Sequence, residues 1–144
     1  MALLEEVSFS AVSSQLPAIM GWVEEKTIKY LPYKLAMRLQ LAAEETIVNV
    51  VKYAYSDDAA DRPINLRLGQ EGNFYLEISD KGVPFNPLKN IKVNPNAPLE
   101  ERILGGWGRE LIIKMTSAAR YEYRDNTNIL HLEENPADAA ETSD

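Results

Sequence analysis

Hydrophobic and polar positions follow two different periods along the 144-residue chain. Residues 4–12 alternate loosely between apolar and polar side chains, which favours a strand. Apolar residues then recur at helical spacing over residues 16–30 and 33–55, with Pro32 between the two helices. Ser13 and Ser14 offer N-caps for the first helix, and Pro17 suits its first turn. The second helix is apolar nearly all round, so we expect it to be buried.

The second half of the chain predicts two hairpins and a third helix. Residues 64–68 and 74–78 alternate with period two around a turn at 69–72, and residues 120–124 and 128–132 do so around Asp125 and Asn126. A helix is predicted from Arg109 to about residue 117. Antiparallel strand pairs with helices able to cover one face indicate an α+β two-layer sandwich, with a mostly antiparallel mixed sheet.

Residues 83–104 contain four prolines and no sustained periodicity. A structureless loop of roughly twenty residues is uncommon in a small domain, and such a loop is often an active-site lid. We therefore predict a lid over residues 83–104.

Composition narrows the class of protein. Apolar residues make up 45% and charged residues 26% of the chain, which is typical of one globular domain. The acidic N-terminal segment and the absence of a long apolar run predict a cytoplasmic protein without a membrane partner. With no cysteine and one histidine, His131, the chain is neither a zinc finger, nor a zincin, nor a cysteine protease.

The net charge of −7 is concentrated at the C-terminus. Residues 133–144 contain five of the 22 acidic residues and no basic residue, so the rest of the chain is close to neutral. We expect a folded domain over residues 1–132 and an acidic disordered tail over 133–144. Because no dense basic stripe is present, we expect no direct contact with nucleic acid.

One arc of the second helix is polar. Arg38, Glu45, Asn49 and Lys52 fall on one side of an otherwise apolar cylinder. This arc is either a solvated face with an ion pair or the wall of a pocket. In a pocket, a carboxylate and an amide one turn apart would suit Mg²⁺ together with a general base.

Asp80 and Gly82 follow directly after a predicted strand, in the segment DKGVPFNP. A carboxylate at the end of a strand can accept a hydrogen bond from an amino group, and glycine lets a planar ligand approach the backbone. A tight turn explains the same residues equally well.

Glycines at positions 105, 106 and 108 precede the third helix. Backbone N–H groups at a helix N-terminus bind anions, whereas the alternative is a flexible hinge. The segment is not a P-loop, because no Lys-Ser or Lys-Thr follows, and it is not a Rossmann turn, because a loop precedes it.

Taken in order, these three segments resemble the N, G1 and G2 boxes of the GHKL, or Bergerat-fold, ATPases. The sequences AAEETIVNVVKYAY, ISDKGVPFNP and GGWGRELI are similar to those of bacterial anti-sigma-factor serine/threonine kinases, which act in partner-switching circuits. The resemblance covers most of residues 1–132.

The resemblance implies a role for each motif residue. Glu45 would be the general base, and Asn49 would coordinate Mg²⁺ at the ATP phosphates. Asp80 would bind the adenine amino group, with Gly82 leaving room beside the base. The phosphate cradle would consist of Gly105, Gly106, Gly108 and the amides around Arg109. The Arg109 side chain would either add positive charge near the phosphates or cap a surface.

We therefore expect an ATP- and Mg²⁺-dependent serine/threonine kinase that acts as an anti-sigma factor. Its substrate would be a serine on a small antagonist protein, a sigma factor is a second candidate partner, and relatives are often homodimers. The alternatives are a nucleotide-dependent binding switch without kinase activity and a bare ATPase module. The chain lacks a helical hairpin with a phosphoacceptor histidine, so it is not a sensor kinase that phosphorylates itself.

Overall fold

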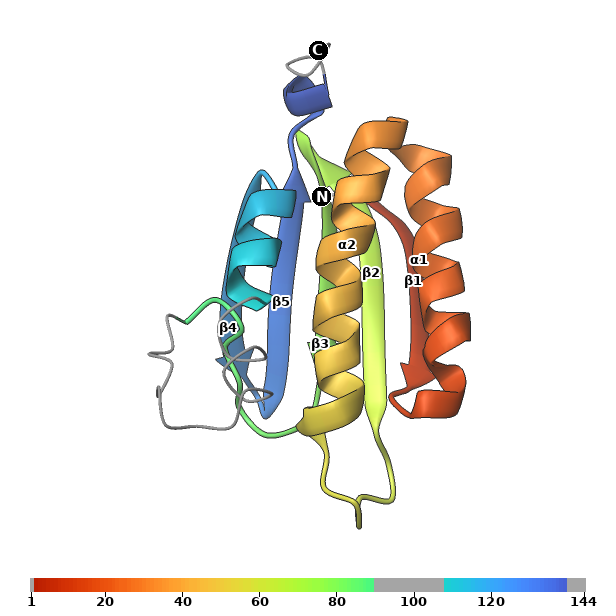
Figure 1. Ribbon diagram of the computed structural model, residues 1–144, viewed down its shortest axis with the longest axis vertical. Helices are drawn as coiled ribbons and strands as arrows, with labels where there is room; N and C mark the ends of the chain where they lie inside the picture. The colour runs from red at the N-terminus through yellow and green to blue at the C-terminus, as the bar shows by residue number, and fades with distance from the viewer. Residues whose placement is uncertain (1, 90–107, 140–144) are drawn as a thin grey trace.

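A computed structural model describes residues 2–89 and 108–139, which form one sheet covered by helices (Figure 1). The sheet has five strands in the order β1-β2-β3-β5-β4, and every described pairing is antiparallel. The strands are β1 (Ala2–Ser10), β2 (Pro63–Glu71), β3 (Asn73–Asp80), β4 (Ala118–Arg124) and β5 (Thr127–Glu134). The predicted mixed sheet is thus antiparallel throughout the described strands.

The helices lie together on one face of this sheet (Figure 1). They are α1 (Leu16–Tyr30), α2 (Tyr33–Asn49) and a helix described over residues 108–115, with short turns η1 (Ser13–Gln15), η2 (Val50–Ala54) and η3 (Pro136–Ala139). This arrangement confirms the predicted α+β two-layer class. In the part of the chain that the structure covers, no helix is long and apolar enough to span a membrane.

The core lies between the sheet and α2. Alternate residues of β2, β3 and β5 point toward the helices, as the period of a strand requires. Fully buried members are Leu35, Leu39, Ile47, Ile64, Leu66, Leu68, Leu76 and Leu132. α2 is less buried than predicted, because Met37 and Leu41 on its outer side are exposed. Its last turn, η2, is π-helical, a local widening that often occurs beside functional sites.

The start of α1 differs from the prediction. Neither Ser13 nor Ser14 caps the helix, because these residues form the 3₁₀ turn η1 and no side chain caps the first turn of α1. Instead the Gln15 side chain accepts a hydrogen bond from the backbone N–H of Ser10 at 3.1 Å. This bond closes the connection from β1 to the helices.

The two hairpin turns follow the sequence signals. Asp125 and Asn126 both adopt positive φ, at 54° and 59°, as a two-residue type I′ turn requires. The first hairpin is tighter than predicted, because β2 continues to Glu71 and only Gly72, with φ 74°, remains at the tip.

The predicted end of the domain at residue 132 falls inside β5, which continues to Glu134. Glu134 is fully buried and accepts a hydrogen bond from the Ser117 N–H at 2.7 Å. It also pairs with Arg38 Nε at 3.2 Å. The acidic segment therefore begins as part of the sheet, while residues 140–144 lie outside the described residues.

Candidate functional site

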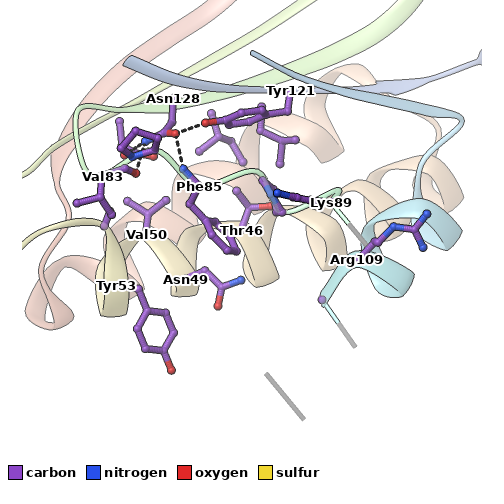
Figure 2. Close-up of a pocket in the computed structure, with 17 residues that line it drawn as sticks. Thr46, Asn49, Val50, Tyr53, Val83, Phe85, Lys89, Arg109, Tyr121 and Asn128 are labelled. Atoms are coloured by element: carbon purple, nitrogen blue, oxygen red, sulfur yellow. Dashed lines mark hydrogen bonds between the residues drawn. The ribbon is translucent and has the colours of Figure 1, made fainter. Parts of the chain in front are cut away.

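A pocket of about 290 Å³ lies between α2 with η2, the end of β3, strands β4 and β5, and the start of the helix over 108–115 (Figure 2). Four of the predicted site residues line it: Asn49, Asp80, Gly108 and Arg109. These residues come from all three sequence motifs. The fold thus brings the helix arc, the segment after β3 and the glycine segment to one cavity.

Asp80 is a buried carboxylate in the wall of this pocket. It is the last residue of β3 and only 7% exposed. Its Oδ1 accepts hydrogen bonds from Gly82 N at 2.9 Å and from Asn128 Nδ2 at 3.0 Å. Burial raises the pKa of Asp80, and these two hydrogen bonds oppose that rise. Since both bonds go to Oδ1, and none from the described residues goes to Oδ2, the second oxygen is left to accept from a ligand.

Gly82 is required by a close approach of two backbones. A Cβ atom at this position would lie 2.2 Å from the carbonyl oxygen of Ala54 and 2.6 Å from its Cβ. The next residue, Val83, donates its N–H to the same carbonyl at 2.9 Å. The structure therefore explains Gly82 by contact with η2, and space for a base beside it remains a prediction.

Tyr55 holds the same segment from the other side. Its hydroxyl accepts from Lys81 N at 2.7 Å and donates to the carbonyl of Pro63 at 2.5 Å. Burial raises the pKa of Tyr55, so the hydroxyl stays protonated as a donor. No motif in the sequence predicts this contact of Tyr55.

Asn128 is a second residue that the motif search missed. It lies on β5, is 6% exposed, and its amide contacts Asp80 and the segment after it (Figure 2). One signal was present in the sequence: Asn128 has the same strand parity as Leu130 and Leu132, so a polar side chain occupies a core-facing position. Such a position calls for hydrogen-bond partners inside the protein.

Glu45 and Asn49 lie one turn apart on α2, as their spacing predicts. Asn49 Nδ2 donates to Glu45 Oε1 at 3.2 Å, so the amide oxygen of Asn49 is left for another ligand. Glu45 lies next to the start of the third helix, because a Cβ on Gly108 would meet Glu45 Oε1 at 2.5 Å. Glu45 is half-buried and, unlike Asn49, is not among the residues that line the pocket.

The other two residues of the polar arc, Arg38 and Lys52, do not line the pocket. Arg38 pairs with buried Glu134 and donates to the carbonyl of Met115 at 3.4 Å, so it joins α2 to the end of β5 and to the last residue of the third helix. Lys52 is exposed. The arc is therefore partly structural and partly a pocket wall, which combines the two interpretations that the spacing allowed.

Arg109 lines the pocket, but its side chain is already engaged. Nε donates to the carbonyl of Leu88 at 2.9 Å, and Nη1 pairs with Glu110 at 3.1 Å. The guanidinium thus ties the third helix to the first part of the predicted lid. Gly105, Gly106, Trp107 and lid residues 90–104 lie outside the described residues.

The donor set fits a magnesium ion that is shared with phosphate. Within the described ranges, no group of three or more His, Asp or Glu could hold a metal ion. Asn49 offers one amide oxygen, and Mg²⁺ commonly takes one or two protein ligands, with phosphate oxygens and water completing its octahedron. A metal at Asn49 would therefore depend on a bound phosphate.

Two of three comparisons with known proteins find proteins that are similar to this chain. Residues 9–133 match the family model for the histidine kinase-like ATPase domain. A search of curated proteins finds no significant match. Among solved structures, the chain is similar to the RsbU and RsbW domains of Rv1364c from Mycobacterium tuberculosis, with a TM-score of 0.59 and 14% identity. The likeness covers 92% of this chain and 32% of that one, so the chain spans about a third of its neighbour's length.

Proposed function

Because the chain belongs to the histidine kinase-like ATPase family, we propose that it is an ATP-dependent protein serine kinase with an anti-sigma regulatory role. One observation carries the proposal. A single pocket brings together a buried carboxylate, Asp80, an amide with a free oxygen, Asn49, and a glycine of the third helix, Gly108. These are groups suited to an adenine, a cation and a phosphate.

The adenine would bind at the Asp80 end. An exocyclic amino group donates two hydrogens, and Asp80 Oδ2 is the acceptor that the surrounding hydrogen bonds leave open. Apolar side chains of Ile78, Val83 and Leu130 line the same region and would contact the base faces.

The phosphates would extend from there toward Asn49 and Gly108. Mg²⁺, when bound with ATP, would neutralise phosphate charge, and the amide oxygen of Asn49 would be its protein ligand. Backbone N–H groups at the N-terminal end of the helix described over 108–115 would donate to phosphate oxygens, because the first amides of a helix have no partner within it. Lys89 on the pocket rim adds positive charge.

In the transfer step, Glu45 would accept the proton of the attacking serine hydroxyl. A serine hydroxyl of the protein substrate would attack the γ-phosphorus, its O–P bond would form, and the bond from the γ-phosphorus to the bridging oxygen of ADP would break. The hydroxyl proton would pass to the Glu45 carboxylate. Glu45 Oε1 is held by Asn49 at 3.2 Å, so Oε2 is the oxygen available to accept the proton.

The partners follow from the resemblance of the three boxes to anti-sigma-factor kinases. The substrate would be a small antagonist protein that carries the target serine, and a sigma factor would be the regulated partner. A homodimer is compatible with both.

The test is transfer of a labelled γ-phosphate. The chain is incubated with Mg-ATP and with each candidate antagonist protein in turn, and label on a serine of one of them supports the kinase proposal. ATP binding without transfer to any candidate, together with nucleotide-dependent capture of a partner, would favour the binding-switch alternative instead. Hydrolysis alone would favour an ATPase module.

A further inference from the structure

We propose that Asn128 is a positioning residue that sets the base specificity of the pocket, an inference that rests on the ATP-binding function proposed above. Asn128 lies on β5, whereas Asp80 is the last residue of β3. It is 6% exposed, and its side chain forms hydrogen bonds with Asp80, Tyr121 and the backbone of the segment after β3 (Figure 2).

The amide of Asn128 uses both of its ends. Nδ2 donates to Asp80 Oδ1 at 3.0 Å and to the carbonyl of Val83 at 2.9 Å. Oδ1 accepts from the N–H of Phe85 at 3.0 Å and from the hydroxyl of Tyr121. A primary amide offers two donor hydrogens and two acceptor sites, so Asn128 is fully satisfied without a ligand. It is therefore a support for the pocket rather than a contact for the nucleotide.

The first consequence concerns the orientation of Asp80. Asn128 and Gly82 both donate to Oδ1, so the carboxylate cannot turn without losing two hydrogen bonds. This holds Oδ2 as the oxygen that faces the pocket. It also favours the ionised carboxylate over the protonated form, because both donors stabilise negative charge. Only an ionised Oδ2 discriminates cleanly between an amino group and a carbonyl.

The second consequence concerns the chain after Asp80. Val83 and Phe85 are exposed residues in a segment without regular structure, and Asn128 binds the backbone of both. The side chain that orients the base-reading carboxylate therefore also holds the backbone of the residues that follow β3.

The test compares ATP with ITP, which replaces the 6-amino group by a carbonyl and leaves the ribose and phosphates unchanged. Dissociation constants are measured by calorimetry for the wild type, Asn128→Leu and Asn128→Ala. Leucine keeps the branching at Cγ without polar atoms, whereas alanine leaves space for water and is the milder change if leucine prevents folding. Asn65→Ala is the matched control, since Asn65 lies on β2, donates through its side chain to Ser8 Oγ at 2.8 Å and is not among the residues that line the pocket.

We expect the wild type and Asn65→Ala to bind Mg-ATP at least about tenfold more tightly than Mg-ITP, the worth of one charge-assisted hydrogen bond. Both Asn128 variants should lose about ten- to hundredfold in ATP affinity but no more than about threefold in ITP affinity, so that the ratio approaches one. A merely structural role would weaken both nucleotides equally.

Three results would contradict, in turn, the role of Asn128, base recognition by Asp80 and the proposed ATP-binding function. Folded Asn128 variants that keep the wild-type ratio would overturn the role of Asn128 alone. A wild type that binds ATP and ITP equally would overturn base recognition by Asp80 as well. A wild type that binds neither nucleotide would contradict the proposed function itself.

Discussion

Replacing Asp80 by asparagine should weaken ATP binding and, at the same time, stabilise the protein without nucleotide. The folded protein holds this carboxylate at 7% exposure, and burial raises its pKa. The ionised group is therefore less stable in the folded pocket than in water. Asparagine has the same shape as aspartate. Its Oδ1 can still accept hydrogen bonds from Gly82 N and Asn128 Nδ2, which lie 2.9 and 3.0 Å from Asp80 Oδ1 in the wild type.

The expected magnitudes follow from those contacts. ATP affinity should fall by about 1.5–3 kcal/mol, because one charge-assisted hydrogen bond to the adenine amino group is lost and an NH₂ group faces it instead. The free energy of unfolding without nucleotide should rise by on the order of 1 kcal/mol, as at other functional sites that are relieved of a buried charge. For a chain of this length that corresponds to roughly 2–4 °C in Tm.

The stability gain should depend on pH. Asp80 has an ordinary pKa of 3.8 when unfolded and a higher one when folded, so between these values the folded state binds more protons. Wild-type stability from this group therefore falls as pH rises through that window and stays low above it. The Asp80→Asn variant lacks this loss, so the difference in Tm should be absent at the acidic end of the window and fully present at pH 7.

Calorimetric titration with Mg-ATP and Mg-GTP tests the predicted change in affinity. Thermal unfolding at several pH values tests the predicted change in stability. The wild type should prefer ATP, and the variant should lose that preference, because its NH₂ can donate to the guanine carbonyl. Unchanged ATP affinity would remove Asp80 from base recognition. A variant with lower stability than the wild type at pH 7 would show that the buried charge is better compensated than its burial implies.

Two further predictions concern the backbone around the pocket and the other face of the sheet. Gly82→Ala should destabilise the fold and weaken ATP binding, because its Cβ meets the Ala54 backbone at 2.2 Å, whereas Gly21→Ala in α1, with no atom near its Cβ, should stabilise by about 0.5–1 kcal/mol; equal Tm values for the two variants would contradict this. The hydrogen bond from His131 at 2.9 Å lowers the pKa of Glu77, so its stabilisation is present above the ordinary value of 4.5 and is lost as pH falls toward the lowered one. His131→Gln should therefore lower Tm more at pH 6 than at pH values below the ordinary pKa of Glu77, and a constant difference across that range would refute the assignment.

Local patterns were sufficient to predict most of the elements. Period-two alternation and the Asp125-Asn126 turn predict the hairpins. Pro32 predicts the break between the two long helices, and in the structure it lies between α1 and α2. The convergence of Asn49, Asp80 and Gly108 could be expected only because their motifs occur in a known order, since spacing alone left each with an ordinary structural explanation. The fold confirms that they line one pocket.

The missed features depend on contacts between residues far apart in the sequence. Glu134 was assigned to a solvated tail because acids at a chain end are usually exposed, but the partners that allow its burial, Arg38 and Ser117, are supplied by α2 and by the chain before β4. Asn128 and Tyr55 act on the segment after Asp80 only because β5 and η2 flank the end of β3. No local pattern encodes such neighbours.

In the proposed mechanism one pocket binds Mg-ATP, while a separate carboxylate, Glu45, activates the attacking hydroxyl. The most direct test measures Mg-ATP affinity and single-turnover phosphate transfer in parallel for Glu45→Gln and Asn49→Ala. Glutamine keeps the oxygen that Asn49 contacts at 3.2 Å and removes only the basic group. We predict that Glu45→Gln binds Mg-ATP within about twofold of the wild type but transfers about 10²–10⁴-fold more slowly, the usual contribution of a positioned base. Asn49→Ala should lose affinity and transfer together, and a Glu45→Gln protein that transfers phosphate at the wild-type rate would contradict the role of Glu45 as the base.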